Sequence, residues 1–231
     1  MLVSLFDYSG EWSRPYLEAG HEVLLVDIAH PPGLNRGSHS RCFTLGLDLS
    51  KPASLHRMLP LIPDHYGLLA APPCDCFTRA SAWLWDRWDE EGKTEEHLRM
   101  FDLTWKLVKL KPPKFWALEN PPGRLWTGRG AKLVEGLRQH QLGSPKFRFD
   151  PWQFGAYAPD HPTSQRRKKT YLWGDFQIPV KAPHPEGARA YVPHLPPRRR
   201  GTIHQLGSRH KRERARTPRG FARAFERANP L

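Results

Sequence analysis

The chain has 231 residues, 39% of them hydrophobic, and a formal net charge of +13. That apolar content supports a buried core and excludes a wholly disordered protein, and the length suits one ordinary domain with a small appendage. The positive excess favours a polyanionic partner, most simply nucleic acid, over a protein that is merely basic and soluble. Nine Trp and eleven Phe beside 36 Lys and Arg favour the same partner, because aromatic and basic side chains suit bases and phosphates.

The cysteine content predicts a reducing compartment. Cys42, Cys74 and Cys76 are the only cysteines, and so small and odd a number is not typical of a disulfide framework. The first residues lack the basic segment of a signal peptide, and no apolar run is long enough for a transmembrane helix. We therefore expect a soluble, cytoplasmic monomer that does not bind membranes.

The first elements predict a strand, a turn, a helix and a second strand. Residues 2–6 form a short apolar run that leads into a tight turn over residues 7–10. Residues 13–19 have helical character, and residues 22–27 form a second apolar run that is closed by Asp27. This order is typical of the opening of a nucleotide-binding α/β domain.

The elements that follow alternate between strands and helices. We expect a loop over 29–41, strands over 43–47, 66–71 and 115–118, and helices over 54–58, 89–110 and 131–139. This alternation predicts an α/β fold with a mostly parallel, doubly wound sheet. Ligands bind such sheets at the carboxyl ends of the strands, where Gly10, Asp27, Asp48, Cys74 and Glu119 all fall.

The composition changes near residue 175. Residues 176–197 are rich in proline, and residues 198–219 contain nine Lys or Arg against one acid. Residues 218–228 return to helical spacing. We therefore expect a catalytic domain over 1–175, a short basic arm over 176–217, and a terminal helix over 218–231 that packs back on the domain.

The turn at Gly10 is weak evidence for a nucleotide site when taken alone. It has one glycine, followed by Glu11 and Trp12, so the dinucleotide fingerprint is absent and an ordinary βα loop is the simpler interpretation. Asp27 strengthens the case, because an acid closing the second strand suits the ribose of S-adenosylmethionine. Asp48, closing the third strand, would reach the adenine amino group.

Cys74 is the candidate nucleophile. A free cysteine is usually a small buried apolar residue, but Pro72 and Pro73 fix the direction of this loop at the edge of the sheet. A basic site would lower the thiol pKa and make a strong nucleophile. Cys76 completes a Cys-x-Cys pair, but with only Cys42 as a third sulfur and no histidine pair at ligand spacing, we expect no metal.

Glu119 is the candidate acid. It closes an apolar strand, and the alternative role is that of a capping or salt-bridging residue. In a closed site its pKa would rise, and the carboxyl would then hold a proton on cytosine N3. Further along, a strand through residues 165–169 would point Gln165, Arg167 and Lys169 to one side, toward the base or its phosphate. A solvated charged surface is the alternative there.

These motifs resemble those of a known family. Pro72-Pro73-Cys74-Asp75-Cys76-Phe77-Thr78 is similar to the Pro-Pro-Cys-Gln-x-Phe-Ser loop of the DNA cytosine-5 methyltransferases, and Glu119-Asn120 matches their Glu-Asn motif. Gln165-x-Arg167-x-Lys169 is similar to their Gln-x-Arg-x-Arg strand. The chain looks most like the compact, phage-type members, which would place it in a host cytoplasm.

The chain departs from the family pattern in three ways. The donor turn lacks its second and third glycines, and Lys169 replaces the second arginine of the strand motif. The segment between Gly174 and Thr217 is far shorter than a typical target-recognition domain. A short recognition segment should contact few bases, so we expect a very short or relaxed recognition sequence. The arm at 176–217 would make the contacts that recognise it.

The resemblance implies a Rossmann-like class I S-adenosylmethionine-dependent methyltransferase fold. It also implies methyl transfer from S-adenosylmethionine to C5 of a cytosine flipped out of double-stranded DNA. Cys74 would attack C6, Glu119 would hold the N3 proton, and Arg167 would orient the base. The donor-binding residues would be Tyr8, Ser9, Gly10, Trp12, Asp27, Ile28, Asp48, Leu49 and Pro72. The nucleic-acid contacts would be Pro73, Asn120, Gln165, Lys169, Arg198, Arg199, Arg200, Arg209, Lys211 and Arg212.

Other functions agree less well with the sequence. Asn120-Pro121-Pro122-Gly123 resembles the Asn-Pro-Pro-aromatic loop of amino methyltransferases, which modify adenine N6 or cytosine N4, but glycine stands in the aromatic position. A zinc deaminase needs His-x-Glu and Pro-Cys-x-x-Cys, which the sequence lacks. A non-catalytic nucleic-acid-binding protein with a methyltransferase-like fold would explain the missing glycines.

Overall fold

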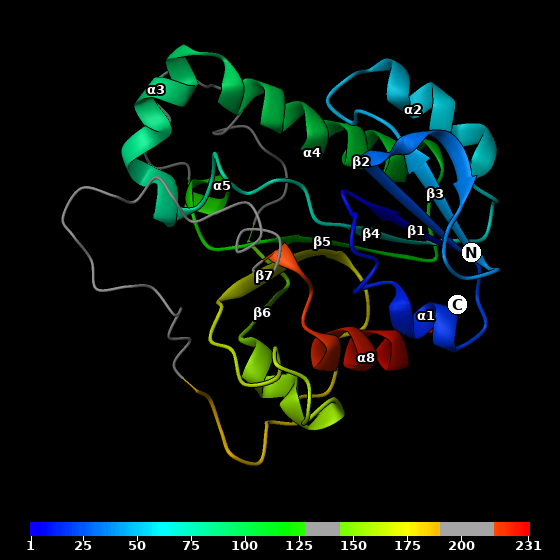
Figure 1. Ribbon diagram of the computed structural model, residues 1–231. Coiled ribbons are helices and arrows are strands. Elements are labelled where there is room, and N and C mark those ends of the chain that lie inside the picture. The colour runs from blue at the N-terminus through cyan, green and yellow to red at the C-terminus, as the bar shows by residue number, and fades with distance from the viewer. Residues whose placement is uncertain (128–143, 190–214) are drawn as a thin grey trace.

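The computed structural model describes residues 1–127, 144–189 and 215–231 (Figure 1). The helix predicted over 131–139 lies outside these residues. So does most of the basic arm, including Arg198, Arg199, Arg200, Arg209, Lys211 and Arg212. Within the described ranges, no helix combines the length and the apolar composition needed to cross a bilayer.

One sheet of seven strands organises the molecule, in the order β3-β2-β1-β4-β5-β7-β6. The strands are β1 (Leu2–Leu5), β2 (Val23–Arg36), β3 (Cys42–Gly46), β4 (Gly67–Ala70), β5 (Phe115–Asn120), β6 (Phe147–Phe149) and β7 (Thr170–Asp175). Strands β1 to β5 pair in parallel, and β7 runs antiparallel to both β5 and β6. The predicted α/β class with a mostly parallel sheet is confirmed, and the order 3-2-1-4-5 is that of a Rossmann-like fold.

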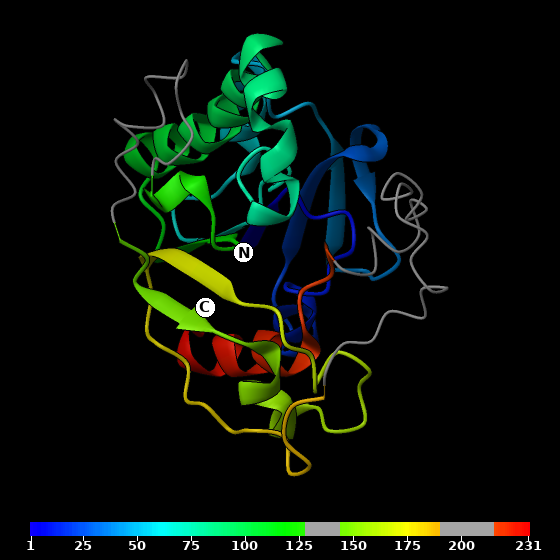
Figure 2. The same cartoon turned by 90° about the vertical axis from the view of Figure 1, so that its left-hand side faces the viewer.

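Helices cover both faces of this sheet (Figures 1 and 2). The described helices are α1 (Arg14–Glu18), α2 (Ala53–Met58), α3 (Trp85–Glu90), α4 (Lys93–Leu110), α5 (Arg124–Thr127) and α8 (Arg219–Ala228), with short 3-10 turns η1 (Leu59–Leu61), η2 (Arg79–Leu84) and η3 (Pro151–Tyr157). Alternate residues of a strand face opposite layers. Val3 and Leu68 therefore join the core under α2 and α4, whereas Leu2 and Leu69 join the core under α1 and α8.

Two predicted segments differ from the structure. The helix predicted over 89–110 is divided into α3 and α4 at Gly92, whose φ of 69° lies in the left-handed region that interrupts a right-handed helix. The loop predicted over 29–41 instead continues β2 to Arg36. Leu45 of β3 pairs with both Val26 and Leu34, so the extra residues cover the outer edge of β3, where backbone groups would otherwise lack partners.

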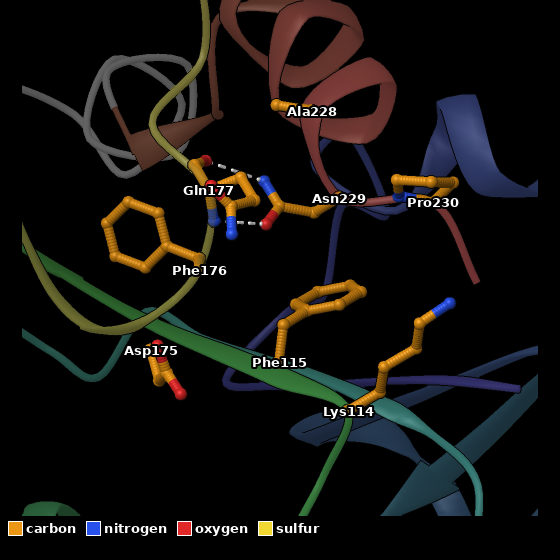
Figure 3. Close-up of a pocket in the computed structure, with 8 residues that line it drawn as sticks. All are labelled: Lys114, Phe115, Asp175, Phe176, Gln177, Ala228, Asn229 and Pro230. Carbon is orange, nitrogen blue, oxygen red and sulfur yellow. Dashed lines mark hydrogen bonds between the residues drawn. The ribbon is translucent and has the colours of Figure 1, made fainter.

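The terminal helix α8 is fastened to the sheet by aromatic packing and by Asn229. Phe221 and Phe225 are buried against Trp12, with ring centroids 5.9 and 5.6 Å away. The Asn229 side chain accepts from the Gln177 backbone N–H at 2.7 Å and donates to the Gln177 carbonyl at 3.0 Å (Figure 3). Tyr16 Oη donates to the Asn229 carbonyl at 3.0 Å. These bonds connect α1, α8 and the segment after β7.

A shallow hollow of about 260 Å³ lies beside Asn229 (Figure 3). Lys114 and Phe115, at the start of β5, form part of its wall. Because this is the amino end of a parallel strand, the hollow lies at the opposite edge of the sheet from the expected ligand positions.

Replacing Asn229 with alanine should lower the free energy of unfolding by about 2 kcal/mol, because the partly buried backbone groups of Gln177 lose their partners. Urea denaturation of the variant and the parent measures this. Gln177→Ala is the matched control, since the Gln177 side chain is exposed and only its backbone takes part. Equal stability of Asn229→Ala and the parent would contradict the assignment.

Candidate functional site

Cys74 and Glu119 lie at the carboxyl ends of neighbouring strands. Ala70, the last residue of β4, pairs with Leu118 of β5, and the chain reaches Cys74 four residues after Ala70 and Glu119 one residue after Leu118. The charge of Glu119 raises the pKa of the Cys74 thiol, so the two groups lie close enough for their charges to interact. The structure therefore brings the predicted nucleophile and the predicted acid into one site.

The Cys74 thiol is poorly ionised in this setting. Burial is the main cause that raises its pKa to about 11, and the charges of Glu119 and Asp75 add to it. Lys168 acts in the opposite direction but does not compensate. The expectation that a basic site lowers this pKa is wrong for the described structure, because removal from water and a neighbouring carboxylate together outweigh one lysine.

Lys168 is the cation beside the acid. Its Nζ lies 3.6 Å from Glu119 Oε1, with side-chain exposures of 36% for Lys168 and 18% for Glu119. Arg167 and Lys169, which the sequence singled out, are exposed. The alternation argument fails because β7 begins only at Thr170, and residues 165–169 form a turn and irregular backbone instead of a strand.

Gln165 is turned toward another part of the chain. Its Nε2 lies 2.9 Å from Glu186 Oε2 and 3.1 Å from His184 Nδ1. A strand would have pointed Gln165 to the same side as Arg167 and Lys169, but the turn over residues 161–165 does not. The prediction that these residues share a face is therefore corrected.

Asn120 is a buried connector between the two loops. It has 0% exposure, and its Nδ2 donates to the carbonyl of Pro72 at 3.2 Å. Pro72 is also buried, whereas Pro73 is exposed. The sequence predicts that Asn120 contacts nucleic acid, but its side chain is buried. Its hydrogen bond to Pro72 instead connects the loop that carries Cys74 to the end of β5.

The turn after β1 is organised by a carboxylate that the sequence analysis did not single out. Asp7 accepts hydrogen bonds from Gly10 N at 2.7 Å, Ser4 Oγ at 2.9 Å, Ser13 Oγ at 3.1 Å and Ser9 Oγ at 3.2 Å. Gly10 has a φ of 66°, which favours glycine. One glycine is thus sufficient here, because Asp7 fixes the remaining backbone. The serines at positions 4, 9 and 13, close to Asp7 in the sequence, are the pattern that could have predicted this hydrogen-bonded turn.

Two further carboxylates are Asp27, just after the part of β2 that pairs with β1, and Asp48, two residues after the end of β3. Burial raises the pKa of Asp27, although a hydrogen bond from Ala29 N at 2.8 Å opposes the effect. For Asp48, burial would raise the pKa, but hydrogen bonds from Ser50 and the charge of Lys51 lower it overall.

Exposed apolar side chains directly follow Asp7 and Asp27 in the sequence. Tyr8 and Ile28 are 53% and 70% exposed, so both are accessible to a flat ligand. Trp12 and Leu49 are different, because they are only 2% and 4% exposed and belong to the core clusters. Trp12 packs against α8, so the prediction that its side chain contacts a donor is wrong.

A buried arginine is the main feature that sequence reasoning missed. Arg124 follows the Asn-Pro-Pro-Gly segment and is 0% exposed. It makes a two-point ion pair with Asp89, with Nη1–Oδ2 and Nη2–Oδ1 both at 2.7 Å. Because the two residues are 35 positions apart, no local sequence pattern predicts this ion pair.

Comparisons with known proteins add no argument to the geometry described above. No family model matches the chain, and no curated protein matches it. A solved structure from E. coli, a prophage-encoded protein that bears the provisional name of a DNA modification methyltransferase, matches with a TM-score of 0.42 and 16% identity. The match covers 77% of this chain and 48% of the other, so this chain spans about half the length of that protein. A likeness this distant carries no argument about function.

Proposed function

We propose that this protein is a DNA cytosine-5 methyltransferase that uses S-adenosylmethionine. The observation that carries the proposal is the placement of Cys74 and Glu119 at the carboxyl ends of adjacent parallel strands, near enough for the Glu119 charge to act on the thiol. A nucleophile and a proton-holding group at close range can act on two atoms of one pyrimidine ring. The net charge of +13 suits the polyanionic substrate.

The donor would bind at the neighbouring strand ends. Asp27 and Asp48 offer acceptors to the ribose and adenine groups, and exposed Tyr8 and Ile28 offer apolar surface to the flat ring. Gly10 supplies the left-handed backbone conformation that the turn beside this surface requires. Bound there, the donor supplies an electrophilic methyl group to cytosine C5.

The residues of this chain would perform the remaining chemistry on the flipped base. The Cys74 thiol gives its proton to water, and the thiolate forms a bond to C6 while the Glu119 carboxyl gives its proton to N3, which leaves C5 electron-rich. After C5 is methylated, water removes the C5 proton, the C6–sulfur bond breaks, and the N3 proton returns to Glu119. Cys74 and Glu119 are regenerated, so the step balances.

The low acidity of Cys74 fits this sequence of events. The charge of Glu119 is one of the causes that raise the thiol pKa. Placing a proton on Glu119 removes that contribution, while burial and the charge of Asp75 still raise the pKa and Lys168 opposes them. The same proton that the base needs at N3 therefore also lowers the pKa of the thiol.

The amino methyltransferase alternative is disfavoured by the packing of Gly123. A Cβ at this position would lie 1.8 Å from the Phe77 carbonyl oxygen, so no aromatic side chain can stand there to stack on a base. The two loops would have to separate to admit one.

Incubation with labelled donor and mixed-sequence double-stranded DNA, followed by nucleoside analysis, tests the proposal. We expect 5-methylcytosine, with methylated positions that share few neighbouring bases. N6-methyladenine or N4-methylcytosine would identify an amino methyltransferase. DNA affinity without donor affinity, measured by calorimetry, would identify a non-catalytic binding protein.

Lys168→Met should slow methylation by about tenfold, because the variant loses a charge that favours the Cys74 thiolate and that pairs with Glu119. Alkylation of the thiol by iodoacetamide at pH 8 should slow as well. Lys169→Met is the matched control, being one residue away and exposed, and should change both rates less than threefold or so. A larger effect of Lys169→Met than of Lys168→Met would restore the assignment made from the sequence motif.

A further inference from the structure

Five of the six backbone carbonyls from Pro72 to Phe77 accept a hydrogen bond. The donors are the Asn120 amide to Pro72, the backbone N–H groups of Phe77 and Thr78 to Cys74, Ser81 Oγ to Asp75, and the side chain and backbone N–H of Arg124 to Cys76 and Phe77. Backbone groups paired in this way restrict the conformations open to a loop. The loop that carries Cys74 is therefore held along most of its length.

Arg124 makes the most extensive of these contacts. Its Nε donates to the Cys76 carbonyl at 2.7 Å, and its backbone N–H donates to the Phe77 carbonyl at 2.9 Å. The guanidinium also pairs with Asp89 at the end of α3 and donates to Thr94 Oγ1 at 2.8 Å at the start of α4. A single side chain thus connects the loop to two helices.

The surroundings fix the position of the guanidinium. Arg124 Cζ lies 4.8 Å from the centroid of the Trp85 ring, and the neighbouring Gly123 is packed directly on the Phe77 carbonyl. Thr94 Oγ1 donates to Asp89 Oδ1, which completes the set of partners. A buried charge is costly unless it is paired and hydrogen-bonded, so this ion pair has one favourable geometry and little freedom.

We propose that Arg124 is a positioning residue for the nucleophile, which it holds at the correct place through the Cys76 carbonyl without touching the substrate. This inference rests on the proposed cytosine-5 methyltransferase activity. Cys74 lies only two residues from the carbonyl that Arg124 binds, so a shift there moves the sulfur. A displacement of about 1 Å in a reacting group lowers rates about a hundredfold.

Arg124→Lys is the variant that tests the inference. A lysine ammonium can still pair with Asp89, but one head group lacks the planar fork that reaches Asp89 and the Cys76 carbonyl together. We expect kcat for methylation to fall about a hundredfold, with KM for the donor changed less than about twofold. The second variant, Arg124→Met with Asp89→Asn, avoids leaving an unpaired buried carboxylate and should show the same split.

Alkylation of the thiol gives a readout that does not depend on methyl transfer. A loosened loop lets water reach Cys74, whose pKa is raised mainly by burial. We therefore expect iodoacetamide to modify Cys74 about tenfold faster at pH 8 in Arg124→Lys than in the parent, although catalysis is slower. A Cys74→Ser background supplies the rate of the other two thiols.

Asn229→Ala serves as the control, because it destabilises a part of the fold remote from the loop. It should keep both kcat and the alkylation rate. Loss of activity in Arg124→Lys with an unchanged alkylation rate, or with a matching loss in Asn229→Ala, would overturn the positioning role. If the parent forms no 5-methylcytosine, the proposed function fails by itself, and the alkylation comparison still decides whether Arg124 holds the loop.

Discussion

Replacing Cys74 with serine should abolish methylation, with a loss in kcat on the order of 10³-fold or more, while donor binding stays intact. An alcohol is far less acidic and less nucleophilic than a thiol, so the covalent step at C6 would fail. The proposed donor contacts, Asp27, Asp48, Tyr8 and Ile28, do not include the altered sulfur, which is why calorimetry should record unchanged donor affinity.

A trapping experiment makes this test sharper. DNA that carries 5-fluorocytosine at the target cannot lose its C5 substituent as a proton, so the bond from C6 to sulfur persists after methylation. We expect the parent to form a denaturation-resistant complex with this DNA and Cys74→Ser to form none. Cys76→Ser is the matched control, because Cys76 is a buried thiol two residues away and should leave the trap intact. Full methylation by Cys74→Ser would contradict the mechanism and favour an amino methyltransferase.

Glu119→Gln should reduce kcat by about 10³-fold, within the range measured for general acids and bases, because an amide cannot give and recover the N3 proton. The same change should make Cys74 more reactive toward iodoacetamide. The Glu119 charge raises the thiol pKa, so its removal lowers that pKa and increases the thiolate fraction at any pH below it. Catalysis and alkylation should therefore change in opposite directions.

The pH dependence of alkylation tests whether removing the Glu119 charge lowers the pKa of the Cys74 thiol. With a thiol pKa of about 11, the parent's rate should rise about tenfold per pH unit between pH 7 and 10. In Glu119→Gln the curve should be displaced toward lower pH. Asp175→Asn is the control, since this acid is exposed at the end of β7 and should alter neither rate. A curve displaced toward higher pH in Glu119→Gln would show that the carboxyl is not what opposes the thiolate.

Much of the fold could be predicted from local pattern. Short apolar runs that end in a polar residue identified β1, β4 and β5, because strands buried on both faces are continuously hydrophobic. Alternation with helical segments then implied parallel strands whose carboxyl ends share one edge. From the shared edge of parallel strands alone, the sequence predicts that Cys74 and Glu119 lie at the same edge of the sheet.

The local sequence pattern gave wrong side-chain positions where residues far away in the chain form the surroundings. Trp12 follows the donor turn, yet α8, over 200 positions later, turns its side chain into the core. Gln165 was placed on a strand face, but His184 and Glu186 engage it in a turn. In each case the local sequence was compatible with both outcomes.

The sequence by itself determined the α/β class, the mostly parallel direction of the main strands, and the edge of the sheet at which ligands are expected. These depend on hydrophobic period and on chain direction, which neighbouring residues encode. Only the tertiary structure decided that Lys168 lies beside Glu119 and that burial raises the pKa of Cys74. The same is true of the hydrogen bond from Arg124 to the Cys76 carbonyl in the loop that carries Cys74. Hydrogen bonding, desolvation and charge pairing depend on distances between groups far apart in the chain, and those distances exist only once the chain is folded.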